Sequence, residues 1–292
     1  MITSLGAKTE VLIEALPYIS RYEGKTFVVK YGGAAMVDDE LKETFAQDVT
    51  LLKKIGIKVA IVHGGGKEIT NIASKLGLES RFVNGQRYTD APMMDVVQMV
   101  LAGKTNKDIV GRINRHDGEA AGLCGIDAHV LKVKKFDEGG VDLGLVGEIT
   151  GVNTVYLNLL LDNGIMPVIA PIGVNDACEP HNINADVAAS AIAAALKAEK
   201  LVFLSDVEGV MAADLLVPSM DGSLAERLMA DGVISDGMIP KIRSAFTALH
   251  AGVNKVHLID GRIKHSILLE IFTDLGVGTE LVHAGDGTSV AV

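Results

Sequence analysis

Tryptophan is absent from this 292-residue sequence, aromatic residues together make up 4% of it, and it has only two cysteines. The shortage of aromatic rings leaves little that could stack on nucleic-acid bases. Cys124 and Cys178 are far apart and lack the spacing of a metal site. We therefore interpret them as free thiols in a reducing cytoplasm rather than as a disulfide.

Positive charge and long apolar runs are also in short supply. Lys and Arg number 27 against 37 Asp and Glu, and the formal net charge of -10 excludes a global basic surface for nucleic acid. No segment approaches the roughly 20 apolar residues of a membrane helix. The N-terminal segment carries Glu10, Glu14 and Glu23 and has no apolar run of signal-peptide length. We expect a cytoplasmic protein that binds neither nucleic acid nor membranes.

Apolar residues, in contrast, make up 48% of the chain, which suffices for a large core. Short apolar segments typical of strands alternate with amphipathic segments typical of helices. We predict strands at 25–30, 58–66, 167–174, 200–210 and 255–260, an interrupting β-ribbon at 132–148, and helices at 38–56, 67–77, 92–114, 184–199, 241–252 and 265–276. This alternation predicts an α/β fold, a three-layer αβα sandwich around a mostly parallel sheet.

A further helix is predicted at residues 9–22, and Pro17 is expected to kink or break it. Its apolar face consists of Val11, Leu12, Ala15, Leu16 and Ile19. A lone amphipathic helix of this length is marginal in water, so this face needs a partner surface. The partner is either the rest of the same subunit or a neighbouring one.

Ligands of such sheets bind beyond the carboxyl ends of the parallel strands. The residues that we expect there are Lys30, Gly32, Gly33, His63, Gly64, Gly65, Gly66, His181, Asn182, Asn184, Asp186, Ser205, Asp206 and Gly209. Glycines allow backbone N–H groups to converge on an anion, and lysine adds a compact positive charge. The pattern predicts a phosphate site. We interpret His63 and His181 as structural residues.

Two common phosphate motifs are excluded. Gly103, Lys104 and Thr105 resemble the end of a Walker A loop, but Gln98 stands where its first glycine is required, and the flanking residues are predicted to be helical. No GxGxxG sequence opens a helix after a strand. Phosphate binding must therefore use another arrangement.

Five segments in fixed order carry a family resemblance: KYGGAAM, VHGGGKEI, NGQRYTD, HNINADVAASAIAAALKAEKLVFLSDVEGV and GMIPKI. Together they resemble the amino acid kinase family over nearly the whole chain. The resemblance implies a single domain, 1–292, with an N-terminal extension at 1–24. It also implies an N-lobe of about 25–178 for the acceptor and a C-lobe of about 179–292 for ATP. Two positions depart from the family pattern: Lys67 replaces a common proline, which should affect only loop stiffness, and Ile126 replaces a frequent lysine.

The resemblance further implies the reaction, which is ATP-dependent phosphorylation, with Mg²⁺, of the γ-carboxylate of N-acetyl-L-glutamate in arginine biosynthesis. Such a carboxylate has a pKa near 4 and is already ionised at neutral pH, so no general base is needed. Positioning and charge stabilisation remain as the enzyme's tasks. The alternatives are another amino-acid or carbamate kinase of this family, or an inert amino-acid sensor.

Each site residue takes its role from the same resemblance. Lys30 and Lys241 would stabilise the transferring phosphoryl group, and Asp186 would hold both lysines. The acceptor would contact Gly65, Gly66, Arg87, Asn182 and Asn184, although helix capping is the alternative role for the two asparagines. The nucleotide would contact Gly32, Gly33, Ser205, Asp206, Val207, Glu208, Gly209, Val210, Val233, Ile234 and Ser235.

Regulation is implied as well, because the N-terminal extension resembles the arginine-inhibited, hexameric branch of the family. In that branch the first helix links dimers into a trimer of dimers. Arginine would bind between this helix and the C-terminal segment, near Glu270, Gly276 and Gly278. A PII-type signalling protein is a possible further partner.

Overall fold

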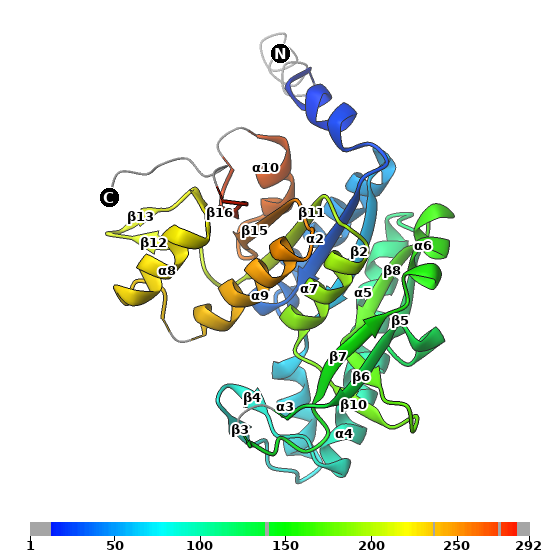
Figure 1. The fold of residues 1–292 in the computed structure, drawn as a ribbon. Helices are drawn as coiled ribbons and strands as arrows, with labels where there is room; N and C mark the ends of the chain where they lie inside the picture. Colours follow the sequence, from blue (N-terminus) through cyan, green and yellow to red (C-terminus); the bar gives the residue numbers. More distant parts are fainter. Residues whose placement is uncertain (1–12, 138–139, 236, 274–275, 285–292) are drawn as a thin grey trace.

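The computed structural model describes residues 13–137, 140–235, 237–273 and 276–284. Its centre is an eight-stranded sheet (Figure 1). In order across the sheet the strands are β14 (Ser219–Met220), β16 (Thr279–Leu281), β15 (Lys255–Asp260), β11 (Lys200–Ser205), β1 (Thr26–Tyr31), β2 (Lys58–His63), β8 (Met166–Ala170) and β5 (Ala120–Cys124). All neighbours are parallel except β15 and β16. The carboxyl ends of β1, β2, β8 and β11 therefore meet at one edge.

Helices cover both faces of this sheet, as the sequence predicts. One face carries α6 (Thr154–Asp162), α7 (Ala185–Ala195), α8 (Gly222–Ala230) and α9 (Met238–His250), and the other carries α2 (Asp39–Lys54), α5 (Asn106–Arg115) and α10 (Ser266–Phe272). Side chains of β1 alternate between the two cores: Val28 packs on the α7 side, whereas Phe27 and Val29 pack on the α2 side. The predicted three-layer αβα sandwich is confirmed.

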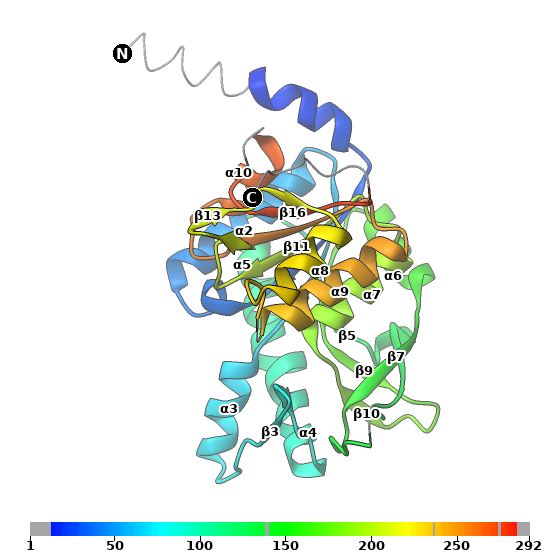
Figure 2. The ribbon, with the colours of Figure 1, turned by 60° about the vertical axis from the view of Figure 1, so that its left-hand side comes forward.

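A smaller layer lies beyond the edge of the sheet at which the carboxyl ends of these strands meet (Figure 2). It contains a four-stranded sheet of β10 (Pro180–Asn182), β9 (Ile172–Val174), β6 (Leu131–Lys135) and β7 (Gly147–Val152). The short hairpin of β3 (Phe82–Val83) and β4 (Gln86–Arg87) lies beside α3 (Gly66–Lys75) and α4 (Ala91–Gln98). Further short elements are η1 (Gly33–Met36), η3 (Asp127–His129) and the hairpin of β12 (Met211–Ala212) and β13 (Leu215–Leu216).

Two predicted elements differ from the structure. The single strand expected at 167–174 is wrong: β8 and β9 are separate and belong to different sheets, and Pro171, which has no N–H for a ladder, lies between them. The helix expected at 92–114 is α4 and α5 joined by η2, a π-helical segment (Met99–Thr105). Gly103 to Thr105 lie within this helical path, which agrees with their exclusion as a phosphate loop.

The N-terminal helix is described from residue 13 and runs to residue 22. It continues through Pro17, so the expected break is absent there, and Glu23 N still donates to Ile19 O at 3.0 Å in the following turn. This helix projects from the body in Figures 1 and 2. Leu16 of the predicted apolar face is 54% exposed, and Ile13, which was not assigned to that face, is 59% exposed. Val11 and Leu12 of the predicted face lie outside the described residues. The exposed part of this face has no contact within the described subunit that would cover it.

Both cysteines lie within the described residues and are free, Cys124 buried and Cys178 exposed. A search of the described residues finds no helix with the length and apolarity to cross a bilayer.

Candidate active site

The centre of the site is one carboxylate between two ammonium groups. Lys30 lies near the end of β1, Asp186 in the first turn of α7, and Lys241 in the first turn of α9. Lys30 Nζ is 2.9 Å from Asp186 Oδ1, and Lys241 Nζ is 2.8 Å from Asp186 Oδ2. The Ser190 hydroxyl donates to Ser244 O at 3.0 Å and so ties α7 to α9 behind this cluster. The structure therefore brings together three residues that are 55 to 211 positions apart in the sequence.

The charges of this cluster do not cancel. All three side chains are at least four-fifths buried, with exposed fractions of 12%, 19% and 13% for Lys30, Asp186 and Lys241. Burial acts to raise the pKa of Asp186, but the two lysines outweigh it and hold that pKa below its usual value. Burial and the charge of Lys30 lower the pKa of Lys241. Two cations on one anion leave an excess positive charge, which suits a negatively charged ligand.

Gly32 and Gly33 leave room for two neighbouring side chains, those of Lys30 and Asp206. A Cβ atom on Gly32 would lie 2.5 Å from Lys30 Nζ. Gly33 has φ +71°, and a Cβ there would lie 2.8 Å from Asp206 Cγ. The backbone N–H of Ala34 donates to the Asp206 carboxylate, which couples β1 to the segment after β11. A side chain at position 32 would crowd the Lys30 ammonium, and one at position 33 would collide with Asp206.

A cavity of about 170 Å³ lies beside the lysine cluster. Its lining residues include Gly65, Gly66, Arg87, Asn182 and Asn184, the five acceptor residues that we predicted from the sequence. Ile69, Phe82, Leu101 and Val146 supply an apolar part of the wall. The cavity therefore combines an apolar wall with one cation and the side-chain amides of Asn182 and Asn184.

Arg87 is fixed in the wall of this cavity. Its guanidinium donates to Ser80 Oγ at 2.7 Å, to Gly66 O at 2.9 Å and to Thr70 Oγ1 at 2.8 Å, and it lies over the Phe82 ring. Burial lowers the pKa of Arg87. In the described part of the chain it forms no ion pair with a carboxylate, so its charge is available to a ligand.

The two asparagines differ in their contacts. Asn182, in β10, donates from Nδ2 to Thr89 Oγ1 at 3.2 Å and caps no helix. Asn184 is the N-cap of α7, and its Oδ1 accepts from Asp186 N at 2.8 Å and from Val187 N at 3.4 Å. Asn184 thus has the capping role that we weighed as an alternative, and through it fixes the backbone that carries Asp186.

The predicted nucleotide residues lie on two segments near the cluster. Ser205 ends β11, and Asp206, Val207, Glu208, Gly209 and Val210 follow it. Gly209 has φ +139° and no space for a Cβ beside Thr279 and Leu216, while Val210 N donates to Thr279 Oγ1 at 2.8 Å. Val233, Ile234 and Ser235 lead into α9, where Ser235 O accepts from Met238 N at 3.0 Å. One segment thus follows the strand next to β1, and the other leads directly to Lys241.

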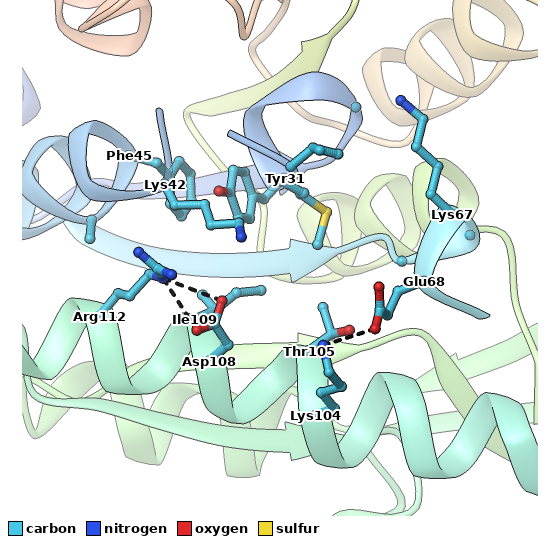
Figure 3. A pocket seen from close by; sticks show the side chains of 16 residues that line it. Tyr31, Lys42, Phe45, Lys67, Glu68, Lys104, Thr105, Asp108, Ile109 and Arg112 are labelled. Atoms are coloured by element: carbon cyan, nitrogen blue, oxygen red, sulfur yellow. Dashed lines mark hydrogen bonds and ion pairs between the residues drawn. The ribbon is translucent and has the colours of Figure 1, made fainter. Parts of the chain in front are cut away.

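A second cavity, of about 250 Å³, also has Gly65 and Gly66 in its wall (Figure 3). Tyr31 and Phe45 stack in it with ring centroids 3.7 Å apart, and Lys104 Nζ pairs with Glu68 at 2.8 Å. Lys67 points away from that pair, and its Nζ is 4.0 Å from Asp206 Oδ2. Lys67 was expected to affect loop stiffness only, and the structure adds this contact across the cleft.

A second cluster of charged and polar side chains lies at the opposite edge of the main sheet. Lys200, at the start of β11, places Nζ 2.7 Å from His257 Nε2, and His257 Nδ1 is 2.7 Å from Glu270 Oε1. Glu270 Oε2 accepts the N–H groups of Val277 at 2.7 Å and Gly278 at 3.1 Å. Gly276 has φ +61°, and a Cβ on it would lie 2.8 Å from Glu270 Oε2. Glu270, Gly276 and Gly278 were predicted from the sequence, whereas Lys200 and His257 were not; each is a polar residue next to apolar ones, at the start of β11 and in β15.

No cluster of three His, Cys, Asp or Glu side chains with the geometry of a metal site occurs in the part of the chain that the structure describes.

The sequence matches the Amino acid kinase family over residues 25–260. It is 55% identical over 274 residues to the acetylglutamate kinase of Chlorobium chlorochromatii, covering 94% of this chain and 96% of that one. It is 53% identical to the acetylglutamate kinase of Aquifex aeolicus, with coverages of 94% and 97%.

Among solved structures, the fold is similar to that of N-acetylglutamate synthase from Neisseria gonorrhoeae complexed with coenzyme A and N-acetyl-glutamate. The TM-score is 0.85 at 26% identity, and the match covers 94% of this chain and 63% of the synthase, so this chain spans less than two thirds of that protein's length. The same synthase complexed with coenzyme A and L-arginine matches with a TM-score of 0.80 at 25% identity, covering 94% and 65%.

Proposed function

The chain belongs to the amino acid kinase family, and we propose that it transfers the γ-phosphoryl group of ATP to the γ-carboxylate of N-acetyl-L-glutamate in arginine biosynthesis. The products are N-acetyl-L-glutamyl 5-phosphate and ADP. The observation that carries the reaction type is the pair of buried lysines on Asp186, beside a cavity that presents Arg87. The acceptor is supported by the names of relatives that share more than half of the residues over nearly the full length.

The residues divide the task between binding and charge stabilisation. Arg87 pairs with the α-carboxylate of the acceptor, where its planar fork suits bidentate contact, and Asn182 donates a hydrogen bond to the same molecule. The γ-carboxylate is ionised and attacks the γ-phosphorus without a base. N–H groups of Gly65 and Gly66, together with Lys30 and Lys241, then stabilise the oxygens of the transferring group.

Asp186 keeps the two lysines in place, and the segments 205–210 and 233–235, with Gly32 and Gly33, hold the nucleotide. In this proposal the acceptor binds the N-lobe, about 25–178, and ATP binds the C-lobe, about 179–292. Mg²⁺ enters as part of the MgATP substrate and neutralises phosphate charge when bound. The protein acts in the cytoplasm, where ATP and the acceptor are available.

A coupled assay of ADP release tests the proposed acceptor. N-acetylglutamate, glutamate, aspartate and carbamate are compared at equal concentration, and only N-acetylglutamate should give rapid release. Preference for carbamate or an unacetylated amino acid would favour another kinase of the family. Absence of ADP release with every acceptor, in protein that binds them, would favour the inert sensor.

Arg87→Leu should raise KM for N-acetylglutamate by about tenfold to a hundredfold and leave KM for ATP nearly unchanged. Hydrogen bonds to a charged group contribute about 1.5–3 kcal/mol, and leucine has no donors to replace them. Steady-state kinetics give KM for each substrate, and calorimetric titration gives the two binding affinities, which should change in the same way. Arg81→Leu is the matched control, because Arg81 precedes the same hairpin but stacks on Tyr88 outside the cavity. Unchanged acceptor affinity in Arg87→Leu would remove the anchor role.

We further propose that L-arginine inhibits the enzyme by binding near Lys200, His257 and Glu270. This cluster offers a buried ammonium for a carboxylate and a buried carboxylate for an amino or guanidinium group. Tyr22 is the last residue of the N-terminal helix and is 4% exposed. The centroid of its ring lies 5.4 Å from Lys200 Nζ, so this helix reaches the cluster. Structural similarity to a synthase that was complexed with L-arginine supports the choice of arginine as the ligand.

The exposed face of the N-terminal helix supports a hexamer in which this helix pairs with that of a neighbouring subunit. Arginine can inhibit only if it prefers one of two global states, and a helix shared by two subunits provides a way to couple them. A PII-type protein is a proposed partner, and purified PII would test it in a pull-down.

Deletion of residues 1–24 should leave kcat near that of the full chain, abolish inhibition by arginine and reduce the particle to a dimer. Sedimentation velocity and arginine titration of the same sample check the three outcomes together. A truncated protein that stays hexameric would contradict the role of this helix in assembly. One that keeps its full response to arginine would contradict its role in inhibition.

A further inference from the structure

Behind the glycine loop 64–66, at the end of β2, two completely buried polar side chains meet. His63 ends β2, Asn106 begins α5, and both are 0% exposed. We propose that they are positioning residues, which hold the glycine loop so that its N–H groups face the transferring phosphoryl group. The inference rests on the proposed kinase function and gives a role to a histidine that we had interpreted as structural.

The orientation of the Asn106 amide follows from its neighbours. Nδ2 is 2.8 Å from Val168 O, 3.4 Å from Leu123 O and 3.2 Å from His63 Nε2. Flipping the amide would place its oxygen against the two carbonyl oxygens, so Nδ2 must be on this side. The nitrogen can only donate, and His63 Nε2 must therefore be the acceptor.

This contact selects one tautomer of His63. Because Nε2 accepts, the ring hydrogen of the neutral histidine is on Nδ1, which lies 2.8 Å from Gly64 O and donates to it. Burial lowers the pKa of His63 to about 4, so the ring is neutral at pH 7. Asn106 thus reaches the glycine loop through the ring and holds the Gly64 carbonyl on the interior side.

Because the Gly64 carbonyl is held on the interior side, the N–H groups of Gly65 and Gly66 can face the ligand. Gly64 N donates to Tyr31 O at 2.8 Å, so both polar groups of Gly64 are bonded inside the protein. Gly66 begins α3, and the first N–H groups of a helix lack partners within it. Gly65 packs against Leu101 so closely that a Cβ there would overlap that side chain. If Gly64 turned over, its carbonyl oxygen would face the phosphoryl oxygens and repel them.

The segment before Asn106 contributes to this arrangement. Leu101 and Thr105 belong to the π-helical η2, and Asn106 follows it directly. A π-helical turn shifts the residues after it around the helix axis, and such turns often occur at functional sites. Figure 3 shows Thr105 on this helical path beside the end of β2.

Two substitutions of His63 separate positioning from stability. Asparagine can place an amide donor where Nδ1 lies, whereas leucine cannot. We expect His63→Leu to lower kcat by about 10², the effect of a misplacement near 1 Å, with KM for ATP nearly unchanged. His63→Asn should recover at least about tenfold of that loss. The order of melting temperatures should be the reverse, because a buried amide with unpaired groups costs more than leucine.

A purely structural histidine would give the same order for kcat and for the melting temperature, and that result would overturn the inference. His283→Leu is the matched control: His283 also bonds a backbone carbonyl, Val253 O at 3.1 Å, but lies near the C-terminus, and its kcat should equal that of wild type. Wild-type protein in the same assay tests the kinase function separately, since a failure of that function would appear there first.

Long-range ¹⁵N–¹H correlation on the unmodified full chain provides a second readout that needs no variant to fold. The ring of His63 should show a protonated Nδ1 and an unprotonated Nε2. A protonated Nε2 would overturn the inference, whether or not acetylglutamate proves to be the acceptor.

Discussion

Replacing either Lys30 or Lys241 by methionine is expected to lower kcat by about 10²–10³ while changing KM for N-acetylglutamate little. In the proposed mechanism both ammonium groups stabilise charge that develops during transfer, and the loss of one charge-assisted contact of that kind has this effect. Methionine keeps the length and apolar stem of the side chain, so packing in the cleft is largely preserved. Steady-state kinetics with both substrates varied give kcat and each KM separately.

Lys58→Met is the control for these variants. Lys58 also forms a lysine–aspartate pair, at 2.6 Å from Asp162, but it lies at the start of β2, at the opposite edge of the sheet from the cleft. Its kcat should match wild type. A Lys30 or Lys241 variant with near-normal kcat would exclude that lysine from the mechanism.

Asp186→Asn should lower kcat by at least about 10² and also reduce the free energy of unfolding, by about 3 kcal/mol. Removing one partner of a buried ion pair leaves an uncompensated charge, and here it leaves two, because Lys30 and Lys241 share the same carboxylate. Without the carboxylate the two ammonium groups repel each other and lose their fixed positions. Urea unfolding and steady-state kinetics measure the two effects on one preparation.

The matched control is Asp162→Asn, whose pair with Lys58 is largely exposed, 59% for the aspartate and 37% for the lysine. An exposed pair contributes at most about 1 kcal/mol. Equal destabilisation in the two variants, or normal kcat in Asp186→Asn, would contradict the holding role of Asp186.

Local patterns explain which parts were predictable from the sequence. Apolar strands and amphipathic helices are set by residue periodicity, so the layers, the strands β1, β2, β11 and β15 and the helices α2, α3, α7, α9 and α10 were predicted, whereas β5, β14, β16, α6 and α8 were missed. Lys30 followed by Gly32 and Gly33 predicts an anion site, because a lysine and two glycines at a strand end have few other uses, and this stays a prediction. The roles of Arg87 and Asn182 came from the family resemblance, because neither residue has a distinctive local pattern.

Features that depend on contacts between distant segments were not predictable in this way. The chain leaves one sheet for another at Pro171, but a proline within an apolar run does not say which sheet each half joins. The pairing of His63 with Asn106, and of Lys200 with His257, joins residues that only the topology brings together. The π-helical segment has the same apolar periodicity as the α-helices on either side, and so was predicted as part of one helix.

Trapping of the product with hydroxylamine tests the central claim most directly, because an acyl phosphate reacts with it to give a hydroxamate. Purified protein is incubated with MgATP, N-acetylglutamate and hydroxylamine, and hydroxamate and ADP are measured together. The account predicts equal amounts of both, dependent on N-acetylglutamate, and nearly none from Lys30→Met. Release of ADP without hydroxamate would show that ATP is hydrolysed and that the γ-carboxylate is not the acceptor.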